Sequence, residues 1–170
     1  APGIVDVHTH YDAQLTWDSD ATPSPALGVT TVVVGNCGFS IAPCPPECRD
    51  LIARNLAEVE GMSLTALRSG TNWEFESFDE YLGLLRQKGV TPNVAAFIGH
   101  SAVRTMVMGE EASERAANDD EVAAMRDLVV GGMDAGAIGF STSTSINHHG
   151  DGGVPMPSRL AEESELRSLV

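Results

Sequence analysis

Four short apolar segments constrain the fold of this chain more than any other feature of its sequence. They lie at residues 4–7, 30–34, 94–98 and 137–140, and each is bounded by Gly, Pro or Asn. None of them keeps a strict alternation of apolar and polar residues, so each is typical of a strand that is covered on both faces. Strands of this kind indicate a parallel sheet.

Helical patterns separate and follow these segments. They cover residues 47–60, 78–88, 119–135 and 158–170. The second starts after Ser77 with Glu80 three positions later, a capping box, and the third starts at Asn118 and stops before Gly136. This alternation predicts the α/β class, as a doubly wound sheet or a (β/α)8 barrel. Four strands cannot close such a barrel, which takes eight strands and about 250 residues, so we expect an open fold or part of a larger one.

Two histidines, His8 and His10, stand directly after the first predicted strand. Residues i and i+2 of a strand point to the same face, so both imidazoles project together from its carboxyl end. Parallel α/β folds place their functional sites at this end of the strands. Two adjacent neutral imidazoles suit a divalent metal such as zinc, whereas a hydrogen-bonded pair of core histidines would give the same pattern.

Cys37 follows the second predicted strand in the same way, within the sequence GNCG. The flanking glycines let the backbone turn sharply, and a thiolate is a strong zinc ligand, so Cys37 is a candidate third ligand beside His8 and His10. An inert buried cysteine is the alternative. Cys44 and Cys48 have no second Cys or His pair at zinc-ribbon distance, and we expect no structural zinc there.

Polar residues also follow the third and fourth predicted strands. His100 is interpreted as a substrate contact or an anchor for a loop, in preference to a metal ligand. Arg104 could bind a substrate carboxylate through its planar guanidinium or form a salt bridge at the surface. Ser141 begins a row of hydroxyl residues and is a further candidate for substrate binding. His148 and His149 lie in a glycine-rich loop, where we expect them to face solvent.

The charge balance of the chain limits the partners that it can have. With 24 acidic and 10 basic residues its formal net charge is −14, which argues against binding to nucleic acids or anionic membranes. No apolar segment approaches the roughly 18 residues of a membrane span, and no leader pattern opens the sequence. Three closely spaced cysteines make a poor disulfide framework. These features favour a soluble, cytoplasmic protein with reduced thiols.

Four sequence segments in this order carry a resemblance to a known family: PGIVDVHTHYDAQ, GVTTVVVGNCGFSIAPC, NVAAFIGHSAVR and DAGAIGFSTS. They resemble the N-acyl-D-amino-acid deacylases (D-aminoacylases) of the amidohydrolase superfamily. The resemblance implies a metal-dependent hydrolase with a (β/α)8 TIM barrel, of which residues 1–170 are about the first half. The flanking β-sandwich and the C-terminal half of the barrel are expected to lie outside these residues.

The resemblance also implies roles for individual residues. His8 and His10 correspond to the metal-binding HxH pair of the family, and Cys37 to the cysteine that ligates zinc where hydantoinases and dihydroorotases have a carboxylated lysine. Two further histidine ligands and the catalytic general-base aspartate are expected beyond Val170. The chain itself would then hold no catalytic residue, and we expect it to be inactive on its own.

The function implied is the zinc-dependent hydrolysis of the linear amide of an N-acyl-D-amino acid, which yields a carboxylate and the free D-amino acid. Ala26 and Leu27, and the lack of an arginine soon after Ser145, depart from the family pattern and leave the substrate preference open. A cyclic amidase of the hydantoinase or dihydroorotase type is the first rival, and Cys37 argues against it. A non-catalytic metal-binding fragment and a complete doubly wound binding domain are rivals from different classes of protein.

Overall fold

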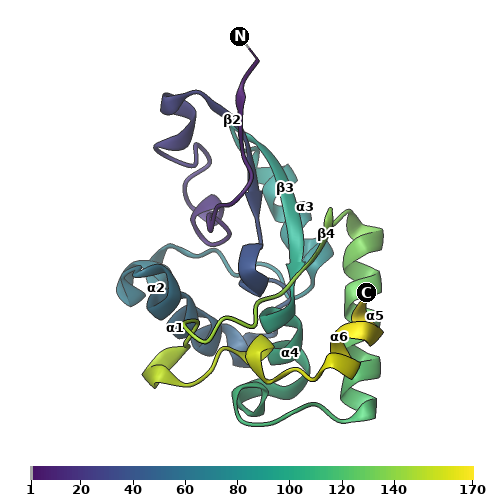
Figure 1. Ribbon diagram of the computed structural model, residues 1–170. Coiled ribbons are helices and arrows are strands. Elements are labelled where there is room, and N and C mark those ends of the chain that lie inside the picture. The colour runs from purple at the N-terminus through teal and green to yellow at the C-terminus, as the bar shows by residue number, and fades with distance from the viewer. Residues whose placement is uncertain (1) are drawn as a thin grey trace.

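The computed structural model describes residues 2–170, which contain one parallel sheet (Figure 1). Its strands are β1 (Ile4–Asp6), β2 (Val29–Val34), β3 (Asn93–Gly99) and β4 (Gly139–Ser141). They lie in the order β1-β2-β3-β4, and each neighbouring pair is parallel. The predicted α/β class with parallel strands is therefore confirmed.

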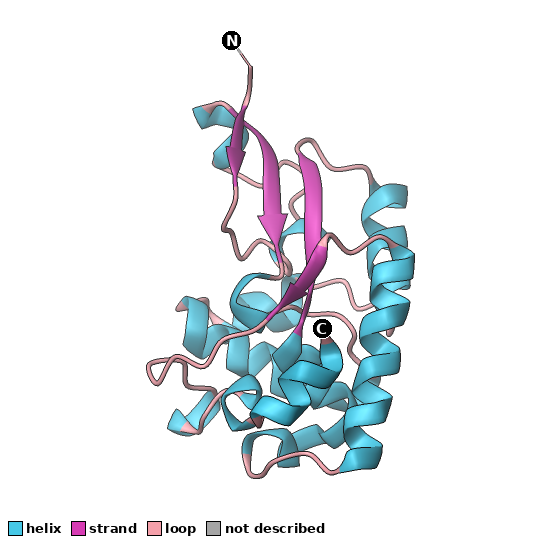
Figure 2. Cartoon of the chain, turned by 45° about the vertical axis from the view of Figure 1, so that its right-hand side comes forward, coloured by secondary structure: helices cyan, strands magenta, loops and turns pink. Residues whose placement is uncertain are grey.

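Six α-helices are present within the described residues. They are α1 (Arg49–Glu60), α2 (Leu64–Gly70), α3 (Phe78–Lys88), α4 (His100–Met108), α5 (Asp119–Ala135) and α6 (Glu163–Leu169). Helix α5 runs beside the sheet, while α1, α2 and α4 gather beyond the end to which the strand arrows point (Figures 1 and 2). No helix in this part of the chain is long and apolar enough to cross a membrane.

The predicted ends of α3 and α5 are confirmed. At the start of α3 the Ser77 hydroxyl accepts from Glu80 N, and the Glu80 carboxylate accepts from Ser77 N, which completes the capping box. Asn118 and Glu121 make the same reciprocal pair at the start of α5. Gly136 ends α5 in the left-handed conformation with φ of +112°.

Some predicted boundaries differ from the structure, and some helices were not predicted. The helix predicted at 158–170 begins only at Glu163, because Pro157–Leu160 form a 3-10 turn and the two residues after it leave the helical conformation. Strand β4 begins two residues later than predicted, since Ala137 N donates to Gly132 O and so belongs to the end of α5. Helices α2 and α4 were not predicted, and α4 follows β3 with no intervening loop.

The coverage of the sheet also differs from the prediction. The carboxyl-terminal halves of β2 and β3 are buried, with Val32, Val34 and Ile98 fully enclosed in the core. Strand β1, in contrast, pairs with one neighbour only, and Ile4 and Val5 are more than half exposed. The apolar sequence of β1 thus does not mean that this strand is covered on both faces in this chain.

Candidate metal centre

The loop after β1 directs His8 and His10 to the same side. Thr9, which stands between them, is buried and turns the other way, because its N and its hydroxyl both donate to Val33 O, at 3.0 and 2.7 Å. His8 N donates to the Asp6 carboxylate at 3.3 Å. The alternation inferred from the sequence therefore continues past the end of β1, and the anchored threonine fixes the direction of both imidazoles.

Cys37 lies in a tight turn just after β2, and its own backbone has a positive φ of 56°. Such a conformation is unfavourable for a residue with a side chain, so the surrounding contacts must hold it. Gly35 starts the turn with φ of +76°, and a Cβ there would lie 2.3 Å from Phe97 O. The Asn36 amide donates to Thr9 O and Val33 O, at 3.1 and 2.9 Å, and so ties this turn to the histidine loop.

Two further side chains brace the turn. Ser141, at the end of β4, donates from its hydroxyl to Gly35 O and accepts from Gly38 N at 3.0 Å. Asp12 accepts a hydrogen bond from Gly35 N at 3.1 Å. Burial raises the pKa of Asp12 to about 7, although this hydrogen bond alone would lower it. Ser141 was predicted to bind substrate, and that role stays a prediction; in this structure its hydroxyl supports the turn that carries Cys37.

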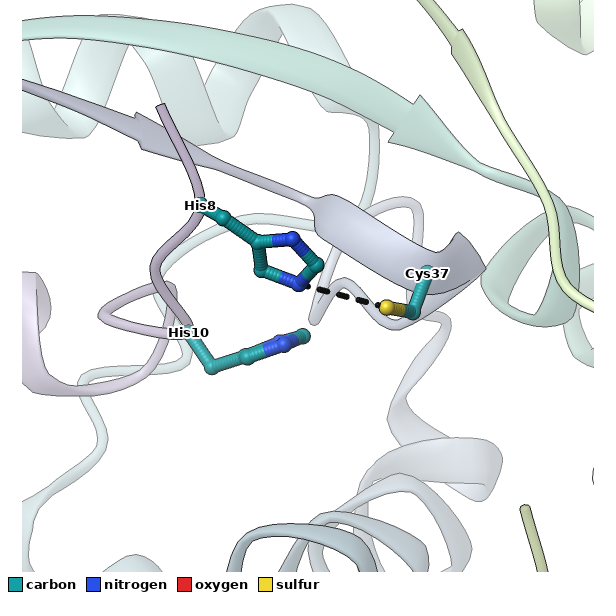
Figure 3. A group of neighbouring side chains, drawn as sticks. All are labelled: His8, His10 and Cys37. Atoms are coloured by element: carbon teal, nitrogen blue, oxygen red, sulfur yellow. Dashed lines mark hydrogen bonds between the residues drawn. The ribbon is translucent and has the colours of Figure 1, made fainter. Parts of the chain in front are cut away.

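His8, His10 and Cys37 converge on one point (Figure 3). Their ligand atoms all lie within 4.8 Å of one another, and His8 Nε2 is 3.3 Å from Cys37 Sγ. The two imidazole rings are tilted, with centroids 5.2 Å apart. The structure thus brings together the three residues selected from the sequence, and their role as metal ligands stays a prediction.

The surroundings leave these donors suited to a cation. Burial, followed by the nearby His8 and His148, lowers the pKa of His10 to about 4, so its imidazole is neutral at pH 7 and keeps a lone pair. Burial and the nearby Glu60 raise the pKa of the Cys37 thiol, so the protein alone does not activate it as a nucleophile. Two imidazoles and one cysteine sulfur match the ligands that Zn²⁺ prefers, and this donor set could hold it.

Comparison with known proteins identifies the family. A profile of the amidohydrolase family matches residues 1–169. The chain belongs to the amidohydrolase family.

This amidohydrolase chain is related to deacylases of N-acyl-D-amino acids. A D-aminoacylase of Alcaligenes xylosoxydans xylosoxydans is 44% identical over 146 residues, which are 84% of this chain and 27% of that protein. An N-acyl-D-glutamate deacylase of the same organism is 31% identical over 171 residues, which are 100% of this chain and 30% of that protein. The chain spans less than a third of the length of these relatives.

Solved structures support the same relationship. A D-aminoacylase structure, 35% identical, matches with a TM-score of 0.74 over 99% of this chain and 31% of that one. The N-acyl-D-glutamate deacylase of Bordetella bronchiseptica, solved with zinc and a phosphonate inhibitor, is 32% identical. It matches with a TM-score of 0.74 over 99% of this chain and 31% of that one. The resemblance to D-aminoacylases and the prediction of a partial TIM barrel are thus confirmed.

His100 and Arg104 of this amidohydrolase occupy a buried cluster at the start of α4. Both side chains are fully buried and bind Glu165 of α6, with His100 Nε2 2.7 Å from Glu165 Oε1. The other ring nitrogen of His100 lies 2.8 Å from the Thr142 hydroxyl. The substrate contacts stay predictions. His100 lies here as an anchor, which the sequence also allowed, and the salt bridge of Arg104 is buried and not at the surface as expected, because α6 places Glu165 against it.

Three neighbours of the candidate metal centre were missed or misjudged from the sequence. His148 does not simply face solvent: its ring packs edge-on against Phe39 at 4.9 Å, and its Nδ1 meets the Ser143 hydroxyl at 2.8 Å. Phe39 also lies beside His10, with ring centroids 6.1 Å apart. Glu60, the last residue of α1, reaches His10, and nothing in the helical pattern marked it out.

Proposed function

We propose that the full-length protein containing this chain is a zinc-dependent amidohydrolase that hydrolyses N-acyl-D-amino acids. The products would be a carboxylate and the free D-amino acid. The observation that carries this proposal is the group His8, His10 and Cys37, which combines a zinc-type donor set with membership of the amidohydrolase family. Relatives described as D-aminoacylase and N-acyl-D-glutamate deacylase support the substrate class.

Within this proposal the chain supplies part of the zinc site. His8 and His10 would each provide one imidazole nitrogen, and Cys37 would provide a thiolate. A bound Zn²⁺ supplies Lewis-acid polarisation of the amide carbonyl and lowers the pKa of a bound water. The braced turn would hold Cys37 at a fixed place, because Ser141, Asn36 and Asp12 restrain its backbone on three sides.

The rest of the machinery is proposed to lie outside residues 1–170. Residues 1–170 would be the N-terminal portion of the barrel, and the remaining histidine ligands and the general-base aspartate would come from the following part of the protein. This division agrees with the share of the relatives that the chain covers, about 27–31%. The isolated chain is accordingly proposed to be inactive.

The experiment is zinc analysis and turnover with the full-length protein. We expect bound zinc and hydrolysis of N-acetyl-D-amino acids, with little turnover of the L enantiomers. Cys37→Ala should remove zinc and activity, whereas Cys48→Ala, at a buried cysteine bonded to Thr105 O, should keep both. Activity that survives Cys37→Ala would contradict the proposal, as would turnover of hydantoins or dihydroorotate in place of N-acyl-D-amino acids.

A further inference from the structure

Glu60 faces His10 from the carboxyl end of α1. Its Oε1 lies 3.3 Å from His10 Nδ1, and each side chain is only 19% exposed. The helix ends there, because Gly61 turns the chain away with φ of +62°. Ile52 and Leu56 bury the helix against the core, so Glu60 stands on a rigid element.

His10 Nδ1 lacks any other partner in the described part of the chain. The atom is buried and makes no hydrogen bond of good geometry, and the Glu60 carboxylate lies within ion-pair distance of it. A buried imidazole nitrogen without a partner is unfavourable, so a bond to this carboxylate is the contact that would satisfy it.

The Glu60 carboxylate is also available to accept a hydrogen bond from His10 Nδ1. Among residues 2–170 it forms no salt bridge with an arginine or lysine, whereas Glu111, Glu121 and Glu163 each pair with an arginine. An acidic side chain with so little exposure usually has a hydrogen-bond or ion-pair partner, and His10 is the partner within reach.

We infer that Glu60 is a positioning residue for the metal site: its carboxylate accepts the Nδ1 proton of His10 and leaves Nε2 unprotonated for the metal. This contact would fix both the tautomer and the orientation of the imidazole. It would also make His10 a stronger donor, because a carboxylate hydrogen-bonded to a ligating histidine raises the basicity of the ring. The inference rests on the proposed zinc function, and it adds the residue that orients one ligand.

The test measures zinc affinity in the full-length protein by competition with a chromogenic chelator. Loss of such a partner typically weakens metal binding by about 10–100-fold, and we expect a reduction of this size for Glu60→Ala. Glu60→Gln should give a smaller reduction, since an amide oxygen still accepts a hydrogen bond but carries no charge. Glu58→Ala, an exposed neighbour on the same helix, is the matched control and should bind zinc like the wild type.

The readouts separate this inference from the proposed function and from a merely structural role. Thermal unfolding of metal-free Glu60→Gln should match that of the metal-free wild type, because the amide oxygen can still accept the Nδ1 hydrogen bond, so its lower zinc affinity would reflect the metal site. A wild type that binds zinc, together with Glu60→Gln and Glu60→Ala variants of unchanged affinity, would overturn the role of Glu60 and leave the proposed function intact. A wild type that binds no zinc would overturn both. The near-isosteric Glu60→Gln keeps the test decisive if Glu60→Ala fails to fold.

Discussion

Two groups of polar side chains follow the strands of the same sheet, and they have opposite surroundings. His8, His10 and Cys37 follow β1 and β2, are exposed or half-buried, and make only one weak contact with each other, between His8 and Cys37. His100 and Arg104 follow β3, are fully buried, and are bound by Glu165, which is itself 3% exposed.

The difference in exposure and pairing suggests different roles: the side chains of the first group remain available to a ligand, and those of the second group stabilise the fold. In the buried cluster each ionisable side chain already has a protein partner, and of the Arg104 guanidinium only Nε lacks a hydrogen bond among the described residues. In the open group the donors converge without satisfying one another, which leaves them available to a cation. Position at the carboxyl end of a strand is shared by both groups and therefore does not identify the site.

The largest effect should come from removing Glu165. Glu165→Ala leaves the buried Arg104 without its carboxylate and His100 without its acceptor, and removing one partner of a buried ion pair costs about 3–5 kcal/mol. Urea unfolding of the full-length variant measures this loss. The exposed pair Glu163 and Arg167 provides the control, because Glu163→Ala should change stability very little. Equal stability of the two variants would break the distinction between the groups.

A smaller effect is expected where the turn carrying Cys37 meets β3. Gly35→Ala combines a positive φ with a close approach to Phe97 O, and we expect a loss of about 2–3 kcal/mol together with weaker zinc binding. Gly152→Ala has nearly the same backbone conformation, with φ of 69° and ψ of 12° against 76° and 20° at Gly35, but meets nothing within 4 Å, so it isolates the cost of that conformation alone. If both variants bind zinc equally well, the turn does not position Cys37.

Ser141 should show a smaller effect still. Ser141→Ala removes the hydroxyl that bonds Gly35 O and Gly38 N, and the expected loss of stability is about 1–2 kcal/mol. Zinc affinity should fall in parallel, because the turn loses one of its restraints. Thr144→Ala, at an exposed position on the same segment, is the control. A Ser141→Ala variant that loses substrate affinity without losing zinc would instead support the predicted substrate contact.

Much of the fold could be predicted from local patterns. Capping residues such as Ser77 and Asn118 define the starts of α3 and α5, because the signal lies within four consecutive residues. Helix α4 was missed because β3 runs directly into it, and an apolar segment without a break gives no boundary. The start of α6 was misplaced because Pro157–Leu160 have a helix-compatible sequence but form only a 3-10 turn.

The candidate site could be predicted where a residue's type and its place directly after a strand mark it. It could not be predicted where only the packing of distant segments brings two residues together. His8 and His10 are two residues apart, so the period of a strand places them on one face. Glu165 lies 61 residues after Arg104, and no local pattern links them. The contact between Glu60 and His10 was equally unpredictable, because only the packing of α1 brings the carboxylate to the imidazole.

The smallest expected effect is a pH dependence confined to the buried cluster. Although burial opposes it, the hydrogen bonds from His100 and Arg104 hold the pKa of Glu165 below its ordinary value of 4.5. A carboxyl group whose pKa is lower in the folded state contributes stability above its unfolded pKa and loses it as the pH falls through the folded pKa.

The difference in unfolding free energy between wild type and Glu165→Gln should therefore shrink as the pH falls below about 4.5. Urea unfolding at a series of pH values measures it. Glu163→Gln, at the exposed pair with Arg167, should show almost no difference from the wild type at any pH. A Glu165→Gln difference that stays constant down to pH 3.5 would mean that the charge of Glu165 does not stabilise the cluster. The buried cluster would then differ from the group of His8, His10 and Cys37 in its packing and not in its electrostatic stabilisation.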